Sequence, residues 1–544
     1  NGILFEKPEQ SCIKQTLGGT MKYKVLCTDG FSNTGLSELQ KNKDLEVVFH
    51  PSLSHDELLN IIGQFDALIV RSASKVSSDV IEKGVKLKII ARAGVGTDNI
   101  DIKAATERGI LVVNAPQGNT ISTSELTFAM LMSLARNIPQ ASHAMADGKW
   151  EKKKFKGTEI SRKTIGIIGL GRIGREVAKI AGNFDMKVLG FDPYLSKEQF
   201  ESLKIVPSSV NDICCNADYI TVHTPLTPET TNLITKKELD MMKPTSKIIN
   251  CARGGIINEQ DLADALRNKK IAGAALDVFT EEPLKINLFE GLENCILTPH
   301  LGASTKEAEE AVAVEAALVV SQYFSDGIGL NAINLAGCDQ NTFKKFKPHI
   351  RLAEKMGTLA AQLSTGGFSK ISFLSTQDMP RLLMLSVIKG SLNSVSSNPI
   401  TIVNAESSAL ERGISISNEI LKEKTEVENS IGIRLTSDNE VIEVWGHILG
   451  GNLLKISKCW DYRVDIDPEG TILFIHNEDK PGVIGKICTI LGAASINIAE
   501  MQNVRHSKGN KALTIIGIDG DIDKTTLQTI ASDPSITGVN IVRF

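Results

Sequence analysis

The feature that most limits how this chain can fold is the stretch 164–175, TIGIIGLGRIGR, in which an apolar run passes through three glycines into a helical pattern. Gly169 permits a tight turn, Gly171 lets the backbone approach a pyrophosphate, and Gly174 lets the new helix pack closely on the strand. The amino terminus of that helix then faces an anion. The spacing predicts a dinucleotide-binding unit, with a glycine turn that binds nothing as the alternative.

A second apolar run supports the dinucleotide interpretation. Residues 187–191, KVLGF, predict another strand, and Asp192 follows it directly, eighteen residues beyond Gly174. A carboxylate at that point accepts hydrogen bonds from an adenosine ribose. Because the same carboxylate would repel a 2′-phosphate, Asp192 favours NAD over NADP.

Length and charge set wider bounds. A chain of 544 residues is long for one hydrophobic core, so three or four domains are expected. With a net charge of −4 and no cationic run longer than 152–154, neither nucleic acid nor a membrane surface is expected as a partner. Nine cysteines without a CxxC pair favour reduced thiols and a cytoplasmic location. No apolar segment reaches the length of a transmembrane helix, and no metal site is predicted.

Residues 1–20 need a separate interpretation, because they begin with Asn1 and precede Met21. We interpret them as an upstream extension or a tag remnant, with a targeting peptide as the alternative.

From residue 21 to about residue 115, apolar runs alternate with helical patterns, at 22–27, 45–49, 67–70, 87–91 and 110–113. This alternation predicts a small α/β unit with a largely parallel sheet. Polar residues follow two of the strands, at 71–75 and 92–99, where open α/β sheets bind ligands; ordinary surface loops are the alternative.

The unit is followed by a predicted hinge at 114–120 and an apolar helix over 124–136, whose start carries a capping pattern at 122–125. The lysines at 152–154 come next. They predict either a solvated face or a contact with a substrate phosphate, which a neighbouring subunit could supply.

Four later strands of the nucleotide unit end in chemically reactive residues. The runs 219–222, 247–250, 273–276 and 294–297 lead to Thr224, Arg253, Asp277 and His300. Since the carboxyl ends of parallel strands meet at one edge of a sheet, we expect Arg253, Asp277 and His300 to converge on the cofactor crevice.

These residue types match what hydride transfer between NAD and a secondary alcohol requires. His300 suits the base, because imidazole titrates near neutral pH, and Arg253 suits bidentate pairing with a substrate carboxylate. Glu282 could hold His300 in place. A lone histidine is more often structural, but an arginine and a carboxylate in the same predicted cleft favour catalysis.

At four motifs the chain resembles the D-isomer-specific 2-hydroxyacid dehydrogenases and, within them, the long-form D-3-phosphoglycerate dehydrogenases. The motifs are GLGRIG at 169–174, CARGG at 251–255, LDVFTEEP at 276–283 and PHLGAST at 299–305. The resemblance spans almost all of residues 21–544. It implies NAD-dependent oxidation of 3-phosphoglycerate to 3-phosphohydroxypyruvate, the entry to L-serine biosynthesis, by a homodimer or homotetramer. Another D-2-hydroxy acid as substrate, or an NAD(H)-sensing corepressor, are the alternatives.

The resemblance also implies residue roles. The catalytic set is Arg253, Glu282 and His300, with His300 as proton donor and acceptor. Cofactor contacts are expected at Val95, Gly169, Gly171, Arg172, Ile173, Gly174, Asp192, Thr224, Cys251, Asp277 and Gly302. Substrate contacts are expected at Arg71, Ser72, Gly94, Asn119 and Lys152, the last standing where relatives often have arginine.

The carboxyl-terminal half resembles the regulatory part of the long-form enzymes. Residues 338–462 look like their intervening domain, with further alternating strands and helices, after an exit linker at 327–337. Between 470 and 544 the pattern predicts strand, helix, strand, strand, helix, strand, a ferredoxin-like order. With NEDKPGVIG at 477–485, this part resembles an ACT domain. That implies L-serine as an effector bound through Asn477, Asp479 and Asn497, with a purely oligomerising domain as the alternative.

The expected fold class is therefore α/β. A flavodoxin-like substrate domain (21–117 and 304–331) and a Rossmann-type NAD domain (118–303) precede an α/β intervening domain (338–462) and a ferredoxin-like ACT domain (465–544).

Overall fold

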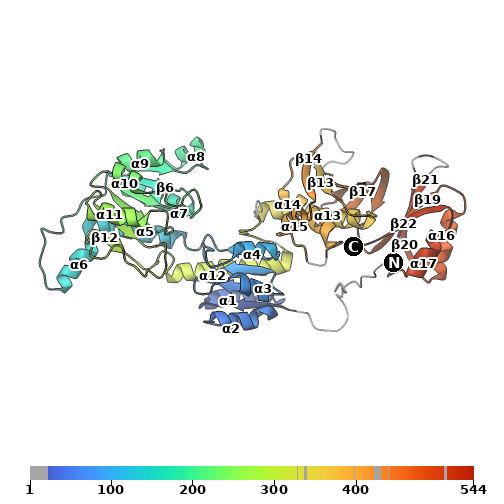
Figure 1. Cartoon of the computed structure of the whole chain (residues 1–544), viewed down its shortest axis with the longest axis horizontal. Helices are drawn as coiled ribbons and strands as arrows, with labels where there is room; N and C mark the ends of the chain where they lie inside the picture. Colours follow the sequence, from blue (N-terminus) through green and yellow to red (C-terminus); the bar gives the residue numbers. More distant parts are fainter. Residues whose placement is uncertain are drawn as a thin grey trace.

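A computed structural model of the chain describes residues 22–327, 329–335, 340–396, 399–421, 430–438, 440–505, 507 and 511–544. Figure 1 shows four units one after another along the long axis: the NAD domain, the substrate domain, the intervening domain and the ACT domain. Residues 1–20, with the extension or tag remnant expected there, lie outside the described residues.

The substrate domain is built on a five-stranded parallel sheet of order β2-β1-β3-β4-β5, the flavodoxin-like order. Strands β3 and β5 are buried along their whole length, as in parallel sheets whose two faces are covered by helices. Its elements are β1 (Tyr23–Cys27), α1 (Asn33–Gln40), β2 (Leu45–Phe49), α2 (His55–Ile61), β3 (Ala67–Val70), α3 (Ser78–Lys83), β4 (Ile89–Arg92), α4 (Ile102–Glu107) and β5 (Leu111–Asn114).

The NAD domain has a seven-stranded parallel sheet of order β12-β11-β10-β9-β6-β7-β8, a Rossmann arrangement whose strand order reverses between β6 and β9. The glycine turn leads out of β6, at that switch point. The elements are β6 (Thr164–Ile168), α7 (Arg172–Asn183), β7 (Lys187–Phe191), α8 (Lys197–Ser202), β8 (Val206–Pro207), α9 (Val210–Asn216), β9 (Tyr219–Val222), α10 (Lys236–Met241), β10 (Lys247–Asn250), α11 (Glu259–Arg267), β11 (Gly273–Leu276) and β12 (Cys295–Leu297).

Two long helices connect these domains, α5 (Thr120–Arg136) and α12 (Lys306–Asp326), and α6 (Ile138–Ala146) follows α5. The predicted cap of α5 at 122–125 is wrong: the helix begins at Thr120, and Asn119 is its N-cap residue. The hydroxyls of Ser122 and Thr123 instead bond Thr305 and the carbonyl of Gly302. They join the outgoing and returning segments of the hinge.

The segment after α12 is also more ordered than the predicted exit linker. Ala332 forms an antiparallel bridge with Val113, and the Asn334 amide bonds Thr106 and the carbonyl of Ile110. Residues 331–335 therefore lie along β5 and belong to the substrate domain.

The intervening domain carries a mixed six-stranded sheet of order β14-β13-β15-β16-β17-β18. Strands and helices do not alternate along it, contrary to the prediction, because five strands follow one another after α15. The elements are α13 (Gln340–Leu363), β13 (Lys370–Ser375), α14 (Arg381–Asn393), α15 (Ala405–Glu411), β14 (Ser415–Ile420), β15 (Ile431–Thr436), β16 (Val441–Leu449), β17 (Leu453–Cys459) and β18 (Tyr462–Ile466).

The ACT domain has the predicted element order and an antiparallel sheet of order β20-β21-β19-β22. Helices α16 and α17 pack on it through a core that includes Leu473, Ile487 and Ile530. Its elements are β19 (Thr471–Glu478), α16 (Val483–Ala493), β20 (Ile498–Arg505), β21 (Lys511–Ile518), α17 (Lys524–Ala531) and β22 (Ile536–Arg543). Within the described ranges, every helix is too short or too polar to cross a membrane.

Candidate active site

The glycine turn has the shape that the sequence predicts. Gly169 has a φ of 94°, in the region that favours glycine. A Cβ on Gly174 would lie 2.0 Å from the Gly169 carbonyl oxygen, whereas the space above Gly171 is open. The carboxylate of Asp192, at the end of β7, accepts a hydrogen bond of 2.9 Å from the backbone N–H of Leu170. Asp192 therefore lies against the turn, and Arg172 and Ile173 open the helix that follows.

The ends of β9, β10 and β11 supply the crevice beside this turn. Thr224 Oγ1 and His223 Nδ1 are buried and have no hydrogen-bond partner in the described chain. Cys251 is 5% exposed, and burial raises the pKa of its thiol to about 12. Its Sγ contacts Met130 Sδ at 3.4 Å. A neutral, packed thiol is thus an apolar wall of the crevice.

Asp277 is fully buried and shapes the turn that carries the histidine. Its carboxylate accepts hydrogen bonds from the N–H groups of Leu301 (2.7 Å) and Gly302 (2.8 Å) and from Thr298 Oγ1 (2.6 Å). Held in this way, His300 has a φ of 55°, a conformation rarely seen for residues with a side chain. Such strain persists only where the surroundings enforce it.

His300 and Glu282 are in direct contact, with His300 Nδ1 2.6 Å from Glu282 Oε2. The second oxygen of Glu282 accepts a hydrogen bond from the N–H of Phe279 at 2.9 Å. Burial raises the pKa of Glu282, but the bonds from His300 and Phe279 and the charge of Arg253 outweigh it and hold the pKa below its ordinary value. Glu282 is therefore an ionised carboxylate at neutral pH and can only accept.

Arg253 reaches from the NAD domain to the substrate domain. Its Nε lies 3.2 Å from Asp98 Oδ2, and its Nη2 lies 2.0 Å from where a Cβ on Gly96 would be. The guanidinium thus rests against the loop 93–99, which follows β4 and includes Val95 and Gly94. The charge of Arg253 also acts on the Glu282 carboxylate, so the pair of Glu282 and His300 lies near this guanidinium. We call the region between this pair, Arg253 and the loop 93–99 the cleft.

Of the other expected substrate residues, Arg71 contacts Glu309 on α12 at 3.0 Å. Ser72 is exposed beside it. Asn119, at the start of α5, has a buried Oδ1 without a partner in the described chain. Lys152 is exposed on the segment after α6, and Figure 1 shows α6 at the end of the NAD domain that points away from the substrate domain. One chain alone therefore does not bring Lys152 to the cleft.

Arg92 and Asp98 are two residues of the cleft that the sequence pattern did not single out, although both belong to the polar run 92–99. A usable signal is their position directly after a parallel strand.

The three expected effector residues are each held within the ACT domain. Asn477 accepts from Thr514 Oγ1 at 2.8 Å, Asp479 pairs with Arg505 at 2.6 Å, and Asn497 donates to Asp519 at 2.7 Å. Asn477 and Asp479 lie near the Arg505 end of the sheet, but Asn497 precedes β20 at the other end. A single chain does not bring all three together.

The residues present fit a dinucleotide. The turn offers an open approach above Gly171, and Thr224 and His223 leave buried polar atoms to be satisfied. In the described part of the chain, no cluster of three or more histidine, cysteine or acidic side chains could hold a metal ion.

Comparison with known proteins agrees with this geometry. The NAD-binding domain of D-isomer-specific 2-hydroxyacid dehydrogenases matches residues 128–302, the D-3-phosphoglycerate dehydrogenase intervening domain matches 345–459, and the ACT domain matches 471–534. Solved structures resemble the catalytic half. The TT0316 protein of Thermus thermophilus covers 57% of this chain and 99% of its own at 31% identity and a TM-score of 0.52. D-lactate dehydrogenase of Escherichia coli covers the same shares at 27% and 0.50.

Curated relatives match nearly the whole chain. D-3-phosphoglycerate dehydrogenase of Methanocaldococcus jannaschii is 39% identical over 96% of this chain and 100% of its own length. The enzyme of Bacillus subtilis is 38% identical over 96% and 99%. Fold and site together define an NAD-dependent dehydrogenase of the 2-hydroxyacid class. Within that class, the chain belongs to the family of D-3-phosphoglycerate dehydrogenases.

Proposed function

We propose that this chain oxidises 3-phosphoglycerate to 3-phosphohydroxypyruvate with NAD, the first step of L-serine biosynthesis. The observation that carries the proposal is the contact of 2.6 Å between His300 Nδ1 and Glu282 Oε2, in a cleft that also contains Arg253. Similarity to D-3-phosphoglycerate dehydrogenases over 96% of the chain supports the choice of substrate.

His300 accepts and returns the proton of the reaction. Because the Glu282 carboxylate is ionised and only accepts, Nδ1 of the neutral imidazole must carry the hydrogen of their bond, which leaves the lone pair on Nε2. In oxidation, Nε2 takes the hydroxyl proton of the substrate, and the same atom returns it in reduction. The resulting imidazolium remains bonded to Glu282.

Arg253 orients the substrate. A guanidinium pairs with a carboxylate through two parallel hydrogen bonds, which fixes the carbon that bears the hydroxyl relative to His300. When bound, NAD supplies the acceptor for the hydride that leaves this carbon with both electrons as the carbonyl forms. We propose that two groups of residues hold NAD. The first is at the glycine turn, Gly169, Gly171, Gly174 and Asp192, and the second is farther along the crevice, Thr224, Cys251 and Gly302.

The first test follows NADH absorbance with NAD and 3-phosphoglycerate, in parallel with lactate, glycerate and NADP, and with phosphohydroxypyruvate reduction as the reverse reaction. We expect turnover of the phosphorylated pair with NAD. Equal turnover of lactate or glycerate would indicate another D-2-hydroxy acid as substrate. A folded protein that binds NADH but turns over nothing would indicate the sensing role.

A second test replaces the base. His300→Ala is expected to lower kcat roughly 10²- to 10⁴-fold, the contribution typical of general acid–base catalysis, while NADH binding persists. A variant with wild-type turnover would remove His300 from the mechanism.

We also propose that L-serine binds the ACT domain between two subunits, since Asn477 and Asp479 lie at the opposite end of the sheet from Asn497. An ACT domain at 471–534 supports this proposal. Adding millimolar L-serine during turnover tests it, with Asn497→Ala as the matched variant. Unchanged rates would leave the domain an assembly role.

An effector site between two subunits requires an oligomer, and we propose a homodimer or homotetramer. Its support in the catalytic half is an exposed apolar group around α6, made of Ile138, Met145 and Trp150. A cytoplasmic location is proposed from the cysteine pattern alone. Sedimentation and imaging of the tagged protein in its own cell test the two proposals.

A further inference from the structure

Three arginines lie at the cleft, and the side chain of one of them has no partner among the described residues. Arg71, Arg92 and Arg253 face the cleft from three strand ends, and the first and last are paired, with Glu309 and Asp98 respectively. The Arg92 side chain forms no hydrogen bond or ion pair among the described residues, and its Nε is buried without a partner. A guanidinium in such a position is costly unless an anion completes the site.

The position of Arg92 is fixed by its neighbours. Its Nη1 lies 1.4 Å from where a Cβ on Gly94 would be, so the side chain folds back over the glycine of its own loop. The guanidinium of Arg253 approaches the same loop in a similar way over Gly96, two residues after Gly94. Since Gly94 and Gly96 are at most about 7 Å apart, the two guanidiniums lie near each other, and the charge of Arg253 acts on Arg92.

The electrostatics of Arg92 agree with this placement. Burial, and then the charges of Arg253 and Arg71, lower the pKa of Arg92 to about 10, while Asp98 and Asp29 oppose the shift. The group still carries its charge at neutral pH. An arriving anion would relieve the repulsion among three cations in a half-buried space.

We propose that Arg92 binds the phosphate of the substrate and thereby sets the preference for phosphorylated over unphosphorylated 2-hydroxy acids. This inference rests on the proposed function, in which Arg253 holds the carboxylate and His300 the reacting oxygen. The phosphate then lies near Gly94 in the loop 93–99, against Arg92. Arg71 is close enough to interact electrostatically but is held by Glu309 on α12.

The test compares reduction of phosphohydroxypyruvate and of hydroxypyruvate, which differ only in the phosphoryl group. Arg92→Gln is expected to lower kcat/KM for phosphohydroxypyruvate about 10- to 100-fold, as loss of a charged hydrogen bond predicts. The value for hydroxypyruvate should change about twofold at most. Arg92→Lys, which keeps the charge without the fork, should recover part of the loss.

A control variant separates binding from structure. Arg108→Gln removes an exposed arginine of the same domain, which bonds only the Glu82 carbonyl among the described contacts, and should behave as wild type. NADH binding, followed by fluorescence, should be unchanged in all variants.

Each outcome separates the two claims. Arg92→Gln with wild-type efficiency toward phosphohydroxypyruvate, or with equal losses for both substrates, would overturn the phosphate assignment while the proposed function stands. A wild-type protein that reduces neither substrate would overturn the proposed function, and this inference with it.

Discussion

At the scale of single residues, the position of one hydrogen determines whether His300 can act as a base. Glu282→Gln should lower kcat for oxidation about 10²- to 10⁴-fold, because an amide N–H can donate to Nδ1 and move the imidazole hydrogen to Nε2. NADH binding should persist. Steady-state kinetics and fluorescence titration measure the two effects.

The neighbouring carboxylate provides the control. Glu281 is exposed and pairs with Lys285 rather than with the histidine. Glu281→Gln should therefore turn over like the wild type, and equal losses in both variants would show that the loop, not the Glu282 carboxylate, matters.

Residue spacing predicted part of the site well and another part poorly, for a physical reason. The roles of Gly169 and Gly174 follow from backbone geometry, which the motif fixes locally. The contact of Arg253 with Asp98 joins two domains, and the fold of Arg92 over Gly94 depends on one rotamer. No local pattern encodes a contact between segments that are distant in sequence, so these had to come from the structure.

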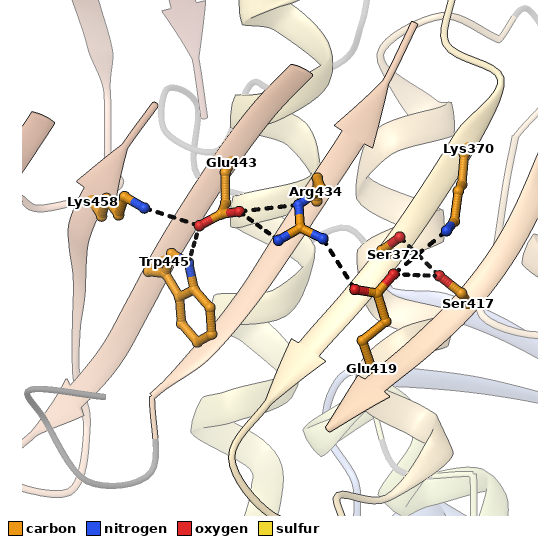
Figure 2. A network of polar contacts seen from close by, with 8 residues as sticks. All are labelled: Lys370, Ser372, Ser417, Glu419, Arg434, Glu443, Trp445 and Lys458. Carbon is orange, nitrogen blue, oxygen red and sulfur yellow. Dashed lines mark hydrogen bonds and ion pairs between the residues drawn. The ribbon is translucent and has the colours of Figure 1, made fainter. Parts of the chain in front are cut away.

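At the scale of elements, one row of cross-strand contacts holds the open side of the intervening sheet together. Figure 2 shows Arg434 on β15 between Glu419 on β14, at 3.0 Å, and Glu443 on β16, at 2.9 Å. Glu443 also accepts from Trp445 and Lys458. The side chains are about one-third exposed or less, so water screens the attraction within each ion pair less than it does for fully exposed pairs.

Arg434→Met should destabilise the intervening domain by about 1–3 kcal/mol, because Glu419 and Glu443 lose the cation that they share and each keeps only a lysine, Lys370 and Lys458 respectively. Arg351→Met, an exposed arginine on α13, should cost far less. Urea unfolding followed by the fluorescence of Trp445 measures both, and equal midpoints would show that the row contributes nothing.

A buried histidine in the turn after β9 predicts how the stability of the NAD domain depends on pH. Burial lowers the pKa of His223 from 6.5 to about 4. The unfolded histidine takes up a proton near pH 6.5 and the folded one does not, so its contribution to stability is complete above that pH and is lost as pH falls toward 4. The loss amounts to about 3 kcal/mol when complete.

His223→Gln should therefore flatten the acid side of the unfolding curve of the NAD domain, identified in calorimetry as the transition that NADH raises. His143→Gln, on exposed α6, should follow the wild type. A variant at position 223 with an unaltered acid limb would contradict the buried, neutral histidine.

Element boundaries were predicted from local pattern within a few residues, but not where a distant segment competes. The start of α5 was misplaced because Ser122 and Thr123 bond the returning segment at 302–305 instead of capping their own helix. The segment 331–335 has no strand-like or helix-like pattern of its own, and its pairing with β5 is a tertiary contact that local pattern does not predict.

At the scale of the whole molecule, hydrophobic packing divides the four domains into two groups. One hydrophobic core runs from the substrate sheet through α12 and α13 into the intervening domain and the ACT sheet, whereas the NAD domain has separate cores. The carboxyl-terminal half is thus packed on the domain that carries Arg92 and Asp98. Arg253 approaches Asp98 from the NAD domain, whose cores are separate.

The substrate domain and the intervening domain are in contact at Gly109, in the turn between α4 and β5. Thr401 Oγ1 donates to its carbonyl at 2.9 Å, and a Cβ on Gly109 would lie 2.7 Å from that hydroxyl and 2.8 Å from Asn404 Nδ2. Gly109→Ala should push the two domains apart and lower hydrogen-exchange protection in both 104–111 and 399–409. Gly413→Ala provides the matched control, since φ is 69° at Gly109 and 72° at Gly413 but nothing lies within 4 Å of the Gly413 position. Both variants carry similar backbone strain. Equal hydrogen-exchange protection in the two variants would therefore mean that this contact does not hold the intervening domain to the substrate domain.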